Sequence, residues 1–143
     1  MTLSADTARN LLGDEQARNI VQLPVKASTT LYQGAFCESA SGLIRGCTAS
    51  SGNAFAGIAL RKADNGSGAD SAINVTLVRR GLLRNIAVTG ASAITDVGST
   101  VYASADDTLT LTSTNNISMG KVVRWISSTL CDVEFEASSA RSI

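Results

Sequence analysis

Residues 98–112, GSTVYASADDTLTLT, contain the pattern that decides the fold. An apolar and aromatic segment precedes Asp106-Asp107, and after this pair threonine alternates with Leu109 and Leu111. A period of two predicts a half-buried strand, because successive side chains of a strand point to opposite faces. Adjacent aspartates between two such segments favour a tight turn, since their side chains bond to nearby backbone N–H groups. The stretch therefore predicts a β-hairpin with a polar tip.

The same period continues from Asn19 almost to the C-terminus. Short apolar segments rich in β-branched residues alternate with clusters of Gly, Asn, Asp and Ser, at spacings of about 8–12 residues. This pattern predicts an all-β fold, a compact β-sandwich or small β-barrel of about 8–10 short strands. The predicted strands are 20–25, 29–36, 42–48, 55–62, 73–80, 82–89, 100–103, 108–113, 121–126 and 130–135.

The first 18 residues lack this pattern. Ser4 can cap a short helix whose apolar face includes Ala8, Leu11 and Leu12. The alternative is an N-terminal arm that becomes ordered only on a partner. The sequence therefore predicts three parts, an arm over 1–18, a β domain over 19–137 and a C-terminal tail over 138–143.

Composition limits both the core and the partners. The chain has 143 residues, of which 20 are Ala and only 35 are Leu, Ile, Val or Phe, so one domain with a modest core is expected. Self-association would bury additional apolar surface, which favours a homo-oligomer.

The net charge is zero and the one basic cluster is Arg79-Arg80 with Arg84, so we expect no nucleic-acid partner. No apolar run is long enough to cross a bilayer and no signal peptide is visible, so we expect no membrane association.

The residue types argue against an enzyme. The chain has no His, which removes the usual general base and the commonest zinc ligand. Gly52 and Gly57 have the spacing of a phosphate-binding loop, but Ile58-Ala59 stand where Lys and Ser or Thr are needed. We therefore predict no catalytic residues and no cofactor.

Two smaller groups of residues have structural and chemical interpretations. Cys37, Cys47 and Cys131 lack the spacing of a zinc or redox motif and are predicted to be buried free thiols. The loop from Asp64 to Asp70 and the Asp106-Asp107 pair offer oxygen ligands for calcium, although neither has EF-hand spacing. Solvated turns are the favoured interpretation of both loops, and calcium binding is the alternative that the sequence leaves open.

Five short stretches, taken in order, resemble the capsid cement, or head decoration, proteins of tailed bacteriophages, many of which were long known only as a domain of unknown function. The resemblance covers residues 20–136. The stretches are Leu31–Phe36 (LYQGAF), Phe55–Ala59 (FAGIA), Asp64-Asn65-Gly66 with the strand up to Gly81, the segment from Asp96-Val-Gly98 to Leu109-Thr110, and Gly120–Val123 (GKVV).

The resemblance implies a small all-β structural protein, made in the host bacterial cytoplasm, on the outer surface of the virion head. Its implied partners are the major capsid protein and other copies of itself, as a homotrimer or alternatively a homodimer. Related proteins use an N-terminal arm on the shell, so Arg9, Leu11, Leu12 and Arg18 are hypothetical capsid contacts.

Two other functions fit the sequence less well. A carbohydrate-binding or other recognition module on a virion would need exposed aromatic side chains, for which only Trp125, Tyr32 and Tyr102 are available. A small β enzyme would need a catalytic constellation that the residue types do not supply.

Overall fold

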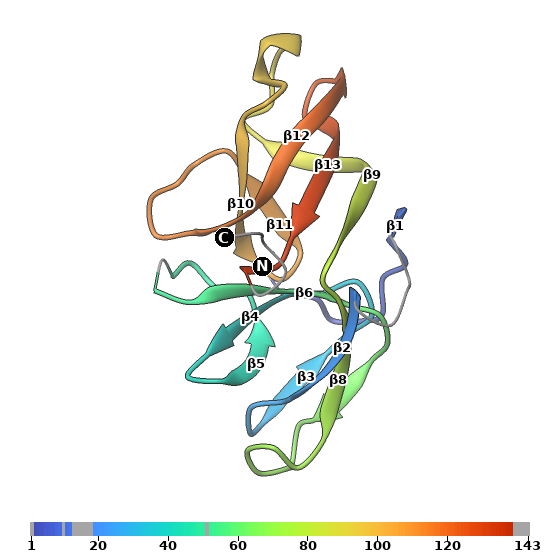
Figure 1. Ribbon diagram of the computed structural model, residues 1–143, viewed down its shortest axis with the longest axis vertical. Helices are drawn as coiled ribbons and strands as arrows, with labels where there is room; N and C mark the ends of the chain where they lie inside the picture. Colours follow the sequence, from blue (N-terminus) through green and yellow to red (C-terminus); the bar gives the residue numbers. More distant parts are fainter. Residues whose placement is uncertain (1, 10, 13–18, 51, 139–143) are drawn as a thin grey trace.

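The computed structural model describes residues 2–9, 11–12, 19–50 and 52–138, and it confirms the all-β prediction (Figure 1). No helix among these residues is long and apolar enough to cross a membrane. The elements, in chain order, are β1 (Leu11–Leu12), β2 (Ile20–Pro24), β3 (Thr29–Leu31), β4 (Phe36–Ala40), β5 (Leu43–Gly46), β6 (Ala54–Ala59), β7 (Ala63–Asn65), β8 (Asn74–Val78), β9 (Arg80–Thr89), the 3₁₀ turn η2 (Ile94–Asp96), β10 (Thr100–Ala105), β11 (Thr108–Thr110), β12 (Ile117–Ser127) and β13 (Leu130–Glu136).

The C-terminal half forms a closed five-stranded barrel, which we call the upper barrel. Its strands follow the order β9, β11, β10, β12, β13, and β13 pairs again with β9. All of these pairs are antiparallel except β11 with β9. The strand β9 bends around the barrel at a bulge where Asn85 has a φ of 54° and donates its backbone N–H to Asp132 Oδ1 at 3.0 Å. Asn tolerates this left-handed conformation better than most residues, so it suits the corner.

The N-terminal half forms a second five-stranded sheet, which we call the lower sheet. Its order is β2, β8, β6, β4, β5, and a parallel bridge between Val25 and Ile44 brings β5 back towards the end of β2. A small two-stranded sheet, β3 with β7, lies beside it. Only Arg79 separates β8 from β9, so nearly continuous chain connects the lower sheet to the upper barrel (Figure 1).

The strand β6 is buried on both faces and joins the two cores. Phe55 and Ile58 belong to the core of the upper barrel, whereas Ala56 and Ala59 belong to the core of the lower sheet. In a regular strand, residues three apart face opposite sides. A bulge at Gly57, whose φ is 136°, shifts the register against β4 and turns Phe55 and Ile58 to the same side. The Phe55 ring then meets Phe135 edge to face, with centroids 6.4 Å apart.

Several predicted elements differ from the observed ones. The predicted strand 29–36 covers β3 and only the first residue of β4, because Gly34 turns the chain between them with a φ of 87°. The short strand β7 was not expected. The helix that the sequence allows at the N-terminus is absent from the described residues, where 2–9 are irregular and extended and Leu11-Leu12 form a strand on β9.

The strand β11 also departs from the expected alternation of buried and exposed faces. Leu109 is buried as predicted, but Thr110 is buried as well, because β11 lies between β9 and β10 within the closed barrel. Its hydroxyl accepts a hydrogen bond from the Thr112 N–H at 3.1 Å. This contact satisfies a polar group that the barrel encloses.

The close approach of β12 to β13 yields a first prediction. A Cβ atom at Gly120 would overlap the backbone carbonyl of Glu134. Gly120→Ala should therefore force the two strands apart and lower the free energy of unfolding by about 2–3 kcal/mol or more. Urea denaturation measures this loss. Gly52→Ala is the control, because no atom lies within 4 Å of a Cβ there. An equal loss in unfolding free energy at both positions would contradict a specific effect of the close approach at Gly120.

Candidate functional site

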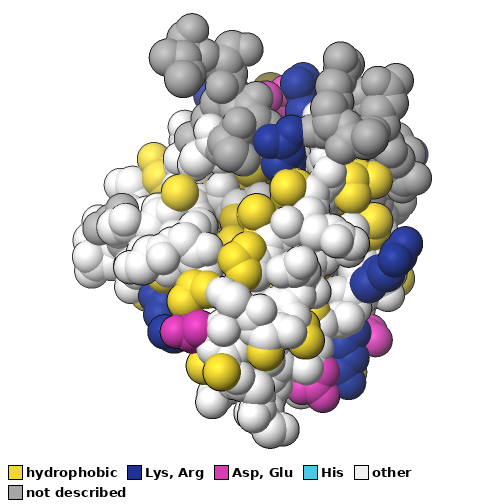
Figure 2. All heavy atoms as spheres, turned by 60° about the horizontal axis from the view of Figure 1, so that its bottom comes forward, with side chains coloured by type: hydrophobic (Ala, Val, Ile, Leu, Met, Phe, Trp, Pro, Cys, Tyr) yellow, Lys and Arg dark blue, Asp and Glu magenta, His cyan; other side chains and the backbone are white. Residues whose placement is uncertain are grey.

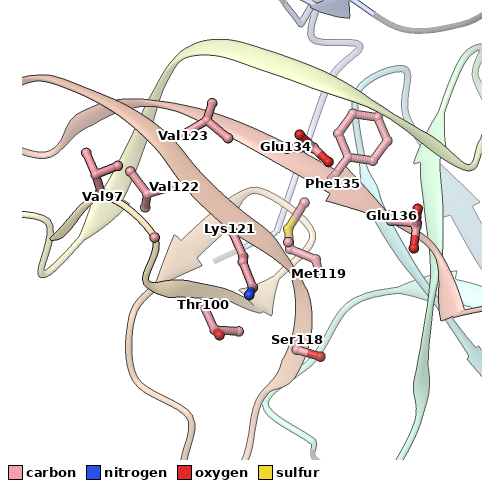
Figure 3. Close-up of a pocket in the computed structure, with 12 residues that line it drawn as sticks. Val97, Thr100, Ser118, Met119, Lys121, Val122, Val123, Glu134, Phe135 and Glu136 are labelled. Carbon is pink, nitrogen blue, oxygen red and sulfur yellow. The ribbon is translucent and has the colours of Figure 1, made fainter. Parts of the chain in front are cut away.

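A groove opens on one side of the upper barrel, between β10, β12 and β13 (Figure 3). Its volume is about 710 Å³. The lining residues are Val97, Gly98, Thr100, Ser118, Met119, Gly120, Lys121, Val122, Val123, Glu134, Phe135 and Glu136. We call this feature the barrel groove.

The barrel groove has an apolar interior and a charged border. Met119, Val122 and Phe135 are buried core residues, and Val97 and Val123 are more than two-fifths exposed. Lys121 lies opposite Glu134 in the register of β12 and β13, and both residues are exposed. An apolar floor with a few charged groups at its edge is typical of a surface that binds another macromolecule or a ligand.

The missing side chain of Gly120 helps to shape the groove. Gly120 is itself a lining residue, and Figure 3 shows its labelled neighbours Met119 and Lys121 on β12 beside side chains of β13. The backbone of Glu134 on β13 approaches Gly120 so closely that only glycine fits there. The strand β12 therefore has no side chain at this point of the groove. The sequence pattern did not reveal the groove, because it depends on which strands are neighbours in the barrel.

A second polar cluster lies at the junction between the two halves of the protein. The Asp106-Asp107 pair forms a two-residue turn between β10 and β11, as the sequence predicted. Asp106, however, is buried, with 6% of its surface exposed. Its backbone carbonyl accepts a hydrogen bond from Phe36 N at 2.9 Å, and its Oδ1 accepts one from Leu3 N at 2.9 Å. The expectation of a solvated tip at Asp106 was therefore wrong, because this hairpin end packs against the lower sheet.

Residues 2–9, which we call the N-terminal strap, cross this junction. Thr7 donates its N–H to Gln33 O at 2.8 Å, and Asp6 Oδ1 accepts the Gln33 N–H at 3.1 Å. Arg9 donates its Nε–H to Gly34 O at 2.9 Å. The guanidinium carbon of Arg9 lies 4.8 Å from the centre of the Phe36 ring, a cation–π contact. The strap thus packs on its own chain.

The charged groups of this junction influence one another. Burial is the main cause that raises the pKa of Asp106, the Leu3 N–H bond opposes the shift, and the charge of Asp107 adds to it. Burial also lowers the pKa of the Arg9 guanidinium, whereas the negative charges of Asp107 and Asp106 counteract that shift. Desolvation is thus the largest influence on the pKa of both groups.

The four residues proposed as capsid contacts have different positions. Arg9 faces its own domain, where it contacts Gly34 and Phe36. The backbones of Leu11 and Leu12 pair with Leu83 and Leu82 on β9. Arg18 lies outside the described residues.

The loops considered for calcium form internal hydrogen bonds. Asp64 Oδ1 accepts bonds from Thr30 Oγ1 and Gly66 N, both at 3.0 Å, and these bonds lower the pKa of Asp64. Asp70 Oδ1 accepts the Ala27 N–H at 2.8 Å. Within the described part of the chain, no group of three or more His, Cys, Asp or Glu side chains is arranged to hold a metal ion.

The cysteines and the aromatic side chains also have structural surroundings. Cys37, Cys47 and Cys131 are buried and free, as predicted. Trp125 donates its indole N–H to Ala91 O at 3.2 Å, and the Lys62 ammonium lies 5.2 Å from the centre of the Tyr32 ring. Tyr102 is partly buried on β10. These positions supply no specific support for a carbohydrate platform.

Neither a protein-family model nor a curated protein sequence matches the chain.

The strap contacts lead to a second prediction. Deleting residues 2–9 should lower the melting temperature by about 5 °C or more, because it removes the contacts of Leu3 and Arg9. Calorimetry measures the change. Gly34→Ala should also destabilise the full chain, since its Cβ would overlap the Thr7 carbonyl oxygen.

A double-mutant cycle distinguishes displacement of the strap from backbone strain. In the chain without residues 2–9, Gly34→Ala should lower the free energy of unfolding much less than it does in the full chain. Without the strap, only the backbone strain at the positive φ of residue 34 remains. If the losses in unfolding free energy caused by the deletion and by the substitution simply add, the strap does not pack against Gly34.

The raised pKa of Asp106 gives a third prediction. A carboxyl group with a higher pKa in the folded state binds protons more readily there, so its contribution to stability decreases as pH rises from the ordinary value of 3.8 through the raised value. Asp106→Asn keeps the acceptor for Leu3 and removes the buried charge. Wild type should therefore lose stability relative to this variant as pH rises above about 4.

Urea denaturation of both proteins across this range tests the sign. The difference between the two proteins isolates Asp106 from the other carboxylates. Asp107→Asn is the matched control on the same turn. A wild type that gains stability relative to Asp106→Asn as pH rises would mean that Arg9 stabilises the charged form more than burial destabilises it.

Proposed function

We propose that the protein is a structural capsid decoration, or cement, protein of a tailed bacteriophage. In this role it binds the outer surface of the head and stabilises contacts between major capsid subunits. Its partners are the major capsid protein and other copies of itself. The proposal needs no catalysis by this chain, because its effect comes from binding alone.

One observation carries the proposal beyond the sequence resemblance. Two of the five resembling stretches, the segment that begins with Asp96-Val-Gly98 and the stretch Gly120–Val123, contribute lining residues to the barrel groove. The groove is also where Val97 and Val123 expose apolar surface. These two stretches thus coincide with a surface suited to binding another protein.

The other resembling stretches have clear roles in the fold. Gly34 makes the turn that receives the strap. The stretch 55–59 joins the two cores, because Phe55 and Ile58 enter the upper barrel and Ala56 and Ala59 enter the lower sheet. The Asn65 amide donates to the carbonyls of Lys26 and Ala69, both at 3.0 Å, and so fixes the loop after β7. A shared fold explains these similarities, which leaves the groove residues as the part of the resemblance that concerns binding.

A cement protein acts by bridging neighbouring subunits. Several modest contacts from one oligomer act together, because the first contact raises the effective concentration of the others. For the shell contacts, Leu11, Leu12 and Arg18 remain sequence-based hypotheses. Arg9 is the weaker candidate, since its guanidinium already contacts Phe36.

The fourth prediction tests this function directly. Purified protein should bind expanded heads that lack it, saturate at a fixed number of copies per head and raise the temperature at which the heads break. Cosedimentation measures the binding, and release of packaged DNA on heating measures the breakage. Heads that already carry the protein are the control, because their sites are filled. Failure to bind, or binding that does not raise the breakage temperature, would refute a cement role.

A further inference from the structure

The exposed apolar residues of the described chain gather on the upper barrel. The large hydrophobic side chains that are more than about a third exposed are Ile94, Val97, Val123 and Leu130, at 69%, 44%, 42% and 37%. Ile94 begins the turn η2, which forms the gold loop at the top of Figure 1. In Figure 2, where the bottom of Figure 1 comes forward, hydrophobic side chains are scattered among white side-chain and backbone atoms.

Ile94 and the barrel groove belong to the same part of the surface. The turn that holds Ile94 also holds Val97, which lines the groove, and the two residues are joined by a hydrogen bond from Val97 N to Ile94 O at 3.2 Å. The strand β12, which forms the groove floor, packs against η2. The protein therefore presents a projecting apolar side chain beside an apolar recess.

We propose that the barrel groove binds the η2 turn of a second copy of this chain, with Ile94 of one copy seated between Val97, Val123 and Met119 of the next. The inference rests on the proposed self-association of the protein and adds the surface and the residue through which it occurs. Because the projection and the recess lie side by side, two copies related by a two-fold axis can exchange them reciprocally.

The charges around the groove favour a second copy over a strongly charged partner. Among the residues that line the groove, Lys121 on β12 lies opposite Glu134 on β13, and Glu136 follows on β13, so both signs of charge are present; Arg124 on β12 already lies 3.9 Å from Asp132 of its own chain. When two identical borders meet in opposite directions, the basic strand of each copy faces the acidic strand of the other. Such a self-complementary pattern avoids like-charge repulsion between copies.

The exposed position of Ile94 permits a clean experiment. Ile94→Asp removes the apolar projection and would place a charge in the recess, whereas Thr95→Asp adds the same charge at the next exposed position of the turn. Sedimentation velocity from about 1 to about 100 µM measures self-association. We expect wild type and Thr95→Asp to associate in this range, and Ile94→Asp to associate at least about 10-fold more weakly. Unchanged thermal melts would show that the fold is intact.

A charge exchange tests the pairing between copies independently. Lys121→Glu and Glu134→Lys should each weaken self-association, because like charges then meet across the interface. An equimolar mixture of the two variants should regain it, since each altered residue meets its complement in the other chain. The intrachain pair is not repaired by mixing, so recovery reports the contact between copies.

Two results would overturn the inference. One is a wild type that stays monomeric up to about 100 µM, and the other is an Ile94→Asp variant that associates as wild type does. Neither measurement uses phage heads. Head binding by a wild type that does not use Ile94 would support the cement role and refute the groove contact. Self-association through Ile94 without head binding would support the groove contact and refute the cement role.

Discussion

The fold depends on one strand, β6, that sends side chains into two cores. Phe55 and Ile58 fill the upper barrel while Ala56 and Ala59 fill the lower sheet. This division requires the bulge at Gly57, where a Cβ would overlap the carbonyl oxygen of Val78. The arrangement lets a chain with few large apolar residues bury the same strand on both faces. It also places the upper barrel, and hence the groove, in a fixed position on the lower sheet.

The N-terminal strap and the Asp106 turn reinforce the same junction. The strap joins Gln33 and Gly34 of the lower half to Asp106 of the barrel through backbone and side-chain hydrogen bonds. Buried charges of this kind stabilise less than their number implies, since desolvation opposes their attraction. These charged groups nevertheless fix the geometry of the junction, because Asp106 and Arg9 form their hydrogen bonds with groups of the protein itself.

The hydrophobic pattern of the sequence predicted most of the strands, but it did not predict which strands lie next to each other in the sheets. The period of two located strands such as β2, β5 and β10, because each has one face towards a core. It did not separate β3 from β4, since the turn at Gly34 is set by the strap that crosses it. The burial of Asp106 was equally invisible, because the sequence shows a turn but not the sheet against which the turn packs. The barrel groove requires β10, β12 and β13 together, and their adjacency is a property of topology.

We propose that this fold decorates a phage head, and a cryo-electron microscopy map of heads from a tailed phage whose genome encodes the chain would test that claim. The account predicts density for the upper barrel and lower sheet on the outer surface of the shell, in repeated copies that touch neighbouring major capsid subunits. Density for this fold inside the shell or on the tail would contradict the claim, and so would intact, expanded heads without it.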